Sequence, residues 1–207
     1  MTVPDPLLPA PAPTRLRVVR TRSAVDLTAA ERAVGDLLKA LGRDPAEPHL
    51  ADTPRRVADA YAELLTPPSF DLTTFANDEG YNELVLAAGI PVQSLCEHHL
   101  LPFSGVAHVG YIPGERIVGL SKLARVVDHF ARALQVQERL TTQVAGWLQQ
   151  ELAPRGVGVV LEAEHMCMSI RGVQKPGATT VTSALHGLVR DDPRTRGEFL
   201  ALAASHA

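Results

Sequence analysis

The sequence predicts an α+β fold in which one sheet of four strands is backed by helices. Apolar residues recur at helical spacing in two separate regions, and segments rich in Val, Ile and Thr lie before and after the second region. The resulting order is two helices, two strands, two helices, two strands and a short helix. In a chain of 207 residues, this order is typical of a single α+β domain.

The first part of the chain is predicted to contain a tail and two helices. Residues 1–22 hold five prolines and four arginines, a composition typical of a disordered tail. Apolar residues at helical spacing predict a helix over residues 26–41, with Thr28 and Glu31 placed like a capping box. A second helix is expected to begin at Thr53, a good N-cap residue, and to end before the next pair of prolines.

The strands and the other helices are predicted in the second part of the chain. Four segments rich in Val, Ile and Thr are interpreted as strands: Leu84–Ile90, Gly105–Ile112, Gly156–Val173 and Thr179–Leu185. Between the second and the third of these, apolar residues at helical spacing predict two helices, over residues 123–134 and 140–152. A short helix is expected near residues 193–203.

The composition argues against several classes of function. The formal net charge is -3, so the chain has no overall positive field to attract nucleic acid. No apolar run approaches the roughly 18 residues of a membrane span, and the N-terminus lacks the apolar segment of a secretory signal. We therefore expect a cytoplasmic protein with neither nucleic acid nor a membrane as its partner.

The sequence Cys96-Glu97-His98-His99 is a candidate metal clip. Residues three apart point to opposite faces of a strand, so Cys96 and His99 can share one ion only where the chain turns. A clip of this kind also arises by chance, and a cysteine is more often a buried small side chain than a ligand. A metal site here requires a third ligand.

Cys167 is the candidate for that third ligand. Alternation along an extended segment places His165, Cys167 and Arg171 on one face. If Cys167 joins Cys96 and His99, the site has two thiolates and one imidazole, and the fourth position of zinc stays open. Structural zinc sites usually have four protein ligands, so the open set indicates a catalytic ion that activates water.

His98 and His165 remain beside this predicted metal site. A histidine titrates near pH 6.5 and can pass protons in both directions, as hydrolysis with a nitrogen leaving group requires. We predict that these two residues are an acid/base pair. The other histidines are interpreted as ordinary core or surface side chains.

A third cluster lies in Gly119–Arg125. Ser121 is predicted as the N-cap of a helix whose first turn carries Lys122 and Arg125, and a helix N-terminus with two cations suits a phosphate group. A solvated helix face with a good cap is the alternative. Arg171 on the predicted metal-facing side favours the phosphate interpretation.

At these residues the sequence resembles the GTP cyclohydrolase I family, from about residue 26 to the C-terminus. The resemblance rests on separate motifs in the order found in that family: Ser94–Phe103, Gly110–Pro113, Gly119–Arg125, Gln135–Thr141, His165–Met168 and Arg171–Lys175. It implies a tunnelling fold, with an antiparallel four-stranded sheet backed by helices. The domain would cover residues 23–207, with N-terminal helices in 23–80 and the core in 81–207.

The resemblance also implies a reaction and a set of site residues. The family hydrolyses GTP to 7,8-dihydroneopterin triphosphate and formate, uses one Zn²⁺ per subunit, and forms a homo-oligomeric ring, usually a decamer of two pentamers. By position, the roles are zinc binding for Cys96, His99 and Cys167, acid/base catalysis for His98 and His165, and purine binding for Gln137 and Glu138. The residues expected around the ribose and triphosphate are Ser121, Lys122, Arg125, Arg139 and Arg171, with Arg56 from a neighbouring subunit.

In the implied mechanism, activated water attacks C8 of guanine while His165 assists proton transfer at N7. A buried carboxylate such as Glu138 can pair with the two N–H donors of guanine, a pattern that adenine lacks. Two other interpretations stay open. One is a non-catalytic relative that keeps zinc for structure or binds pterins, and the other is the related nitrile reductase, whose motifs we do not find in the sequence.

Overall fold

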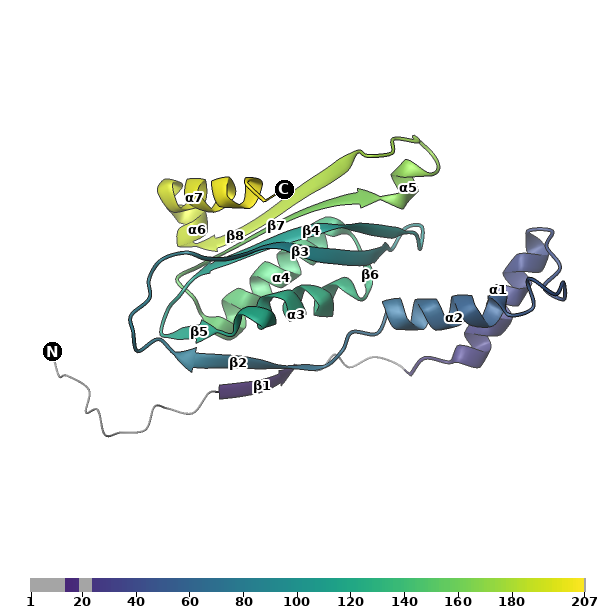
Figure 1. The fold of residues 1–207 in the computed structure, drawn as a ribbon, viewed down its shortest axis with the longest axis horizontal. Coiled ribbons are helices and arrows are strands. Elements are labelled where there is room, and N and C mark those ends of the chain that lie inside the picture. Colours follow the sequence, from purple (N-terminus) through teal and green to yellow (C-terminus); the bar gives the residue numbers. More distant parts are fainter. Residues whose placement is uncertain (1–13, 19–23, 207) are drawn as a thin grey trace.

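The structure is a computed structural model that describes residues 14–18 and 24–206 (Figure 1). Its strands are β1 (Thr14–Val18), β2 (Phe70–Ala76), β3 (Val85–Cys96), β4 (Pro102–Ile112), β5 (Arg116–Val118), β6 (Leu134–Gln135), β7 (Gly156–His165) and β8 (Thr179–Gly187). Its helices are α1 (Leu27–Ala40), α2 (Thr53–Leu64), α3 (Leu120–Ala131), α4 (Gln137–Leu152), α5 (Met166–Ser169), α6 (Leu188–Asp191) and α7 (Pro193–Ala204). Within the described ranges, no helix has the length and apolar character needed to cross a bilayer.

The central sheet has the strand order β6-β3-β4-β7-β8. Its four long strands, β3, β4, β7 and β8, pair with their neighbours in antiparallel fashion. This confirms the four predicted strands and their predicted antiparallel sheet. The extra strand β6 has two residues and pairs in parallel with Leu95 and Cys96 at the end of β3. One predicted metal ligand therefore lies at the point where β6 joins the sheet.

Helices α3 and α4 cover one face of the central sheet (Figure 1). The stripes of apolar residues that predicted these helices are buried against it: Leu123, Val126, Val127, Leu140, Val144 and Leu148. Burial of one such side chain contributes roughly 1.5–3 kcal/mol relative to exposure. This helix layer therefore forms the main core, and it fixes the position of both ends of α3 and α4 relative to the sheet.

The opposite face of the sheet holds a smaller core under α6 and α7. Phe199 of α7 packs there with Ile112 and Val189. Gly110 and Gly158 face each other across β4 and β7, and a Cβ atom at either position would lie within 3.0 Å of the Phe199 ring. Glycine at these two positions therefore lets the aromatic ring pack directly on the strands. Helix α7 confirms the short C-terminal helix that was predicted from the sequence.

A second sheet and the N-terminal helices differ in part from the prediction. Strands β1, β2 and β5 form a three-stranded sheet, of which the sequence analysis predicted no strand. Residues 14–18 belong to β1, so the predicted disorder of residues 1–22 is wrong for this segment, because its backbone pairs with β2. The remainder of the predicted tail lies outside the described residues.

The two N-terminal helices lie where they were predicted, but they are capped differently. The side chain of Asp26 accepts a hydrogen bond from the backbone N–H of Ala29, so Asp26 replaces the expected capping box at Thr28. Asp52 occupies the N-cap position of α2, and Thr53 is the first helical residue. Both helices extend beyond one end of the central sheet (Figure 1).

Candidate metal centre and active-site pocket

The chain turns directly after β3, and this turn brings His99 back towards Cys96. The carbonyl oxygen of Cys96 accepts hydrogen bonds from the backbone N–H groups of His99 and Leu100, at 3.3 and 2.9 Å. Leu100 has a φ of 55°, the left-handed conformation that closes the turn. As a result, His99 Nδ1 lies 3.7 Å from Cys96 Sγ, as the clip interpretation of this segment requires.

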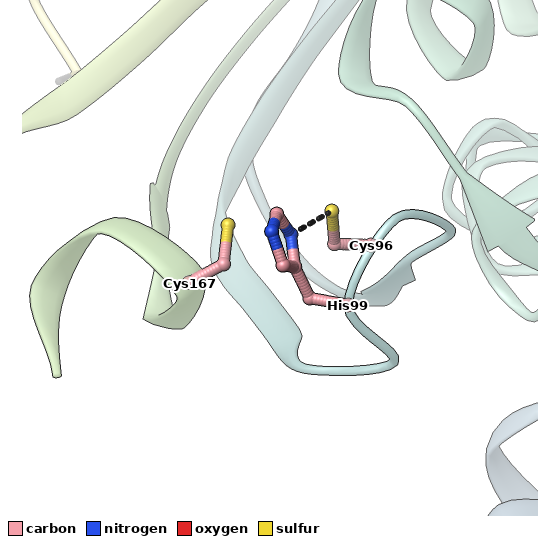
Figure 2. Close-up of side chains that lie close together, drawn as sticks. All are labelled: Cys96, His99 and Cys167. Carbon is pink, nitrogen blue, oxygen red and sulfur yellow. Dashed lines mark hydrogen bonds between the residues drawn. The ribbon is translucent and has the colours of Figure 1, made fainter. Parts of the chain in front are cut away.

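Cys167 approaches the same point from another element. The strand predicted over Gly156–Val173 is correct only up to His165, where β7 ends and the chain continues into the helical turn α5. Cys167 therefore lies on α5, while the preceding His165 is the last residue of the strand. The ligand atoms of Cys96, His99 and Cys167 lie within 4.8 Å of one another, and Figure 2 shows the three side chains converging.

The chemistry of this trio fits a divalent metal ion. Burial raises the pKa of the Cys167 thiol most. The neighbouring Cys96 raises it further, because two thiolates at this distance repel each other. A bound cation would favour both thiolates over the thiols. Two sulfur atoms and one imidazole are among the ligand sets that zinc takes at catalytic sites, where a fourth position stays open.

A cavity of about 230 Å³ lies beside the three ligands. Its lining consists of Cys96, His98, His99, Gln135, Val136, Gln137, Glu138, His165, Cys167, Met168 and Thr180. The structure therefore gathers both predicted catalytic histidines and both predicted purine-binding residues around the metal trio. Thr180 at the start of β8 was not predicted, because only the pairing of β8 with β7 brings this residue to the site.

His165 is held firmly at the inner side of this pocket. Its ring stacks on Phe103 with centroids 4.5 Å apart and an interplanar angle of 11°, and its Nε2 atom lies 2.8 Å from Gln137 Oε1. Burial lowers the pKa of His165, and the charge of Glu138 partly opposes that shift. A pKa below the ordinary value of 6.5 keeps most of the imidazole neutral at pH 7.

His98 and Glu138 are more open to solvent. The side chain of His98 is 62% exposed and lies 3.8 Å from the carboxylate of Glu97, while its ring contacts that of His99 edge to face. Glu138 lines the pocket but is exposed in the single chain. The expectation that Glu138 is buried is therefore wrong for a single chain. No other residue in the part of the chain that the structure describes covers the solvent-facing side of Glu138.

The side chain of Gln137 is used within the protein. It is 2% exposed, its Nε2 group donates to acceptors on β7 and β8, and its Oε1 atom contacts His165. These bonds argue against the predicted contact between this side chain and the purine ring.

The predicted phosphate-binding residues do not line the pocket. Gly119, and not Ser121, is the N-cap of α3, so Ser121 and Lys122 lie within its first turn. The twelve residues of α3 span about 18 Å, and its C-terminal end leads to β6 beside Cys96. Ser121 and Lys122 consequently lie at the end of α3 that is remote from the metal trio (Figure 1).

The remaining arginines occupy three different settings. Arg171 is near enough to Cys167 for its charge to lower the pKa of that thiol slightly, so it lies close to the metal trio. Arg56 is on α2 and pairs with Asp52 at 3.0 Å. Arg139 pairs with the carboxylate of Glu97 and also donates to Gln135 and Leu134, so its guanidinium braces the turn that holds the metal clip.

Comparison with known proteins identifies the family. The model of the family described as GTP cyclohydrolase I matches residues 30–204. The chain belongs to the GTP cyclohydrolase I family. Proteins named GTP cyclohydrolase 1 are similar to it: that of Mycobacteroides abscessus is 54% identical, over 88% of this chain and 92% of the relative. The relative from Streptomyces avermitilis is 58% identical, over 84% of this chain and 88% of the relative. The relative from Aquifex aeolicus is 52% identical, over 86% of this chain and 97% of the relative.

GTP cyclohydrolase I enzymes are hydrolases, and membership of the family argues against the nitrile reductase interpretation. A solved structure of the archaeosine synthase QueF-Like in its apo form is also similar, with 18% identity and a TM-score of 0.42, over 50% of this chain and 93% of that chain. The sequence analysis gave no role to Thr180, which lies in no local motif and reaches the pocket through tertiary packing alone, or to Met168, which lies in the His165–Met168 motif.

Proposed function

We propose that this chain uses one zinc ion to hydrolyse GTP to 7,8-dihydroneopterin triphosphate and formate, the first step of tetrahydrofolate and pterin biosynthesis. The observation that carries the proposal is the meeting of Cys96, His99 and Cys167 in the wall of a pocket that also contains His165 and Glu138. The relatives named GTP cyclohydrolase 1, at more than half identity over most of the chain, support the same reaction.

Cys96, His99 and Cys167 would hold the zinc ion. When bound, zinc supplies Lewis-acid chemistry that lowers the pKa of a water molecule far below its value in bulk water, to about 7. Burial holds Cys96 in place before the ion arrives, and the turn after β3 holds His99 beside it. The brace from Arg139 to Glu97 supports this turn from its outer side.

The two histidines would move the protons. Cleavage of the imidazole ring of guanine requires a proton at N7, and a neutral, half-buried imidazole such as His165 can take up a proton and deliver it there. His98 is at the exposed side of the metal trio, where it can exchange protons with solvent. His98 is more exposed to solvent than His165, and this difference supports the view that the two histidines transfer protons in different steps of the reaction.

Guanine would be selected by Glu138. A carboxylate accepts hydrogen bonds only, so it pairs with the ring N–H and the exocyclic amine of guanine, and adenine offers no such pair of donors. Gln137 contributes its backbone at the start of α4, because its side chain is bonded inside the protein. The purine itself, or a second chain, would cover the exposed side of Glu138.

The triphosphate would lie at a boundary between subunits. Arg171 is close to the metal trio of its own chain, whereas Ser121, Lys122 and Arg125 are on the part of α3 that leads away from it. We propose a homo-oligomeric ring, a decamer of two pentamers, in which these residues and Arg56 reach the pocket of a neighbouring copy. The position of α3 in the single chain supports such a shared site.

One assay tests the proposed function. Purified, zinc-loaded protein is incubated with GTP, and released formate is measured together with the fluorescent pterin that forms after oxidation. We expect both products from GTP, neither from ATP, and neither after the metal is removed with a chelator. A protein that holds zinc but releases no formate from GTP would instead be a non-catalytic relative.

A further inference from the structure

The side-chain amide of Gln137 has no N–H proton left for a ligand. Its Nε2 group donates to the carbonyl oxygens of Leu161 and Thr180, at 3.0 and 2.8 Å, and to the hydroxyl of Thr182 at 3.2 Å. An amide –NH₂ has two protons, so these acceptors on β7 and β8 use both of them. The side chain is therefore a fixed part of the pocket floor.

These bonds also settle which way the amide group faces. The reverse orientation would place Gln137 Oε1 against two carbonyl oxygens, so three acceptor oxygens would meet without a proton between them. The oxygen must therefore face His165, whose Nε2 atom is 2.8 Å away. Thr141 supports this arrangement. Its hydroxyl donates its one proton to the backbone carbonyl oxygen of Gln137, so in the contact between the two hydroxyl groups Thr182 is the donor and can accept from Gln137 Nε2.

The orientation of the amide determines the tautomer of His165. An amide oxygen accepts hydrogen bonds and holds no proton, so His165 Nε2 must be the protonated ring nitrogen. The stacked ring of Phe103 holds the imidazole plane in place. No hydrogen bond to His165 Nδ1 is found in the described part of the chain, so Nδ1 is the nitrogen left for a ligand in the pocket.

We propose that Gln137 is a positioning residue, whose amide oxygen holds His165 in the Nε2–H tautomer and thereby makes Nδ1 the atom that exchanges protons with the substrate. This inference rests on the proposed function, in which His165 carries the proton of the purine N7. Because an amide cannot take the proton from Nε2, every proton that enters or leaves the ring passes through Nδ1.

The tautomer can be measured on the unaltered zinc-loaded protein. ¹⁵N NMR of protein labelled at histidine distinguishes a protonated from an unprotonated ring nitrogen, and the spectrum of His165→Ala identifies the signals of His165 by their loss. We expect the nitrogen coupled to both ring C–H protons, which is Nε2, to be the protonated one. An unprotonated Nε2 in the neutral ring would overturn the proposal, whether or not the protein releases formate.

A double-mutant cycle tests the functional consequence. Gln137→Leu keeps the volume but removes the acceptor for His165, and we expect kcat to fall about 10- to 100-fold with little change in KM for GTP, as for other supporting residues of catalytic side chains. Gln137→Leu combined with His165→Ala should be no slower than His165→Ala alone, because the two residues act as one unit. Independent, additive losses would contradict the proposal.

Thr182→Val is the matched control. It removes another hydrogen bond of the same Gln137 amide, on its Nε2 side, and does not touch His165. We expect its kcat to stay within a few-fold of the unaltered enzyme, and the Nε2–H signal of His165 to persist. A higher KM with unchanged kcat in Gln137→Leu would show that the side chain contacts GTP, which would also overturn the proposal.

Discussion

At the scale of single residues, the metal site depends on an arrangement that places two thiols side by side. Burial and the neighbouring Cys96 raise the pKa of Cys167, so the pair is unfavourable as thiolates without a cation. Serine in place of Cys167 keeps the size but gives a poor zinc ligand. We expect Cys167→Ser to lose its zinc, whereas the unaltered protein carries about one ion per chain.

Metal analysis of the two purified proteins measures this difference. Met168→Leu is a suitable control, since Met168 also lies on α5 and lines the pocket but is not one of the three ligands. Full zinc content in Cys167→Ser would show that the three ligands are assigned incorrectly.

His165 allows a prediction that separates catalysis from metal binding. His165 contacts Gln137 and Phe103 and is not one of the three converging ligands. His165→Ala should therefore keep its zinc and lose about 10²- to 10⁴-fold in turnover, the usual contribution of a positioned acid/base group. Zinc content and single-turnover formate release, measured on the same preparation, check both parts. Loss of zinc together with activity would make His165 a ligand.

These residues show how far sequence reasoning reaches into the site. Cys96 and His99 were predictable from their spacing, because a turn is the one way to bring them together. Cys167 was placed correctly for the wrong reason, since a helical turn, and not strand alternation, directs it to the other ligands. The role of Gln137 was not predictable, because its partners lie on β7 and β8, 24 to 45 residues further along the chain.

At the scale of elements, long periodic segments were predictable and short ones were not. The stripes of apolar residues in α3 and α4 predicted both helices, and the four long strands were found from their composition. Strand β2 alternates buried and exposed residues, but Thr74 is buried and Phe75 is exposed, so its apolar residues do not follow this alternation. Strands β5 and β6, with three and two residues, are too short to show any period.

The connection between β7 and β8 is the element on which the site depends most. It carries Cys167 and Arg171, and three of its residues have positive φ: Gly172, Gln174 and Gly177. From β7, Glu164 reaches into it and accepts hydrogen bonds from Ser169 Oγ and from the backbone N–H of Gly177, at 2.5 and 2.9 Å. These bonds lower the pKa of Glu164 and tie the two ends of the connection to one carboxylate.

We expect Glu164→Ala to loosen this connection. The variant should bind zinc more weakly and show a higher KM for GTP, by about 10-fold, because Cys167 and Arg171 lose their support. Glu164→Gln keeps an acceptor oxygen and should restore most of both values. Glu162→Ala is the matched control: Glu162 lies on the same face of β7 and accepts from Thr179 Oγ1 at 2.9 Å, at the start of β8. Equal effects in Glu162→Ala and Glu164→Ala would contradict the prediction.

At the scale of the whole molecule, one chain forms an incomplete surface. Strand β8 is an edge of the central sheet, because it pairs with β7 on one side only in the described residues. Leu37 and Leu41 at the end of α1 and Val181 on β8 are all more than half exposed. Free edges and exposed apolar side chains of this kind are typical of surfaces that other subunits cover. This supports the proposed ring.

The shared site gives the ring a sharp test. Arg125→Ala should strongly reduce turnover because the triphosphate loses a cation, and His165→Ala should strongly reduce it because proton transfer is impaired. If Arg125 serves the pocket of a neighbouring copy, rings assembled from both variants contain some pockets in which both residues are native. Random mixing makes these about a quarter of all pockets, so formate release should recover to a comparable fraction of the unaltered rate. If Arg125 serves its own chain, every pocket carries one defect and the mixture keeps the low rate of the two separate variants. The two variants are unfolded and refolded together with zinc, and formate release is compared with that of a mixture of the separately refolded proteins. Analytical ultracentrifugation checks that both samples form the same assembly.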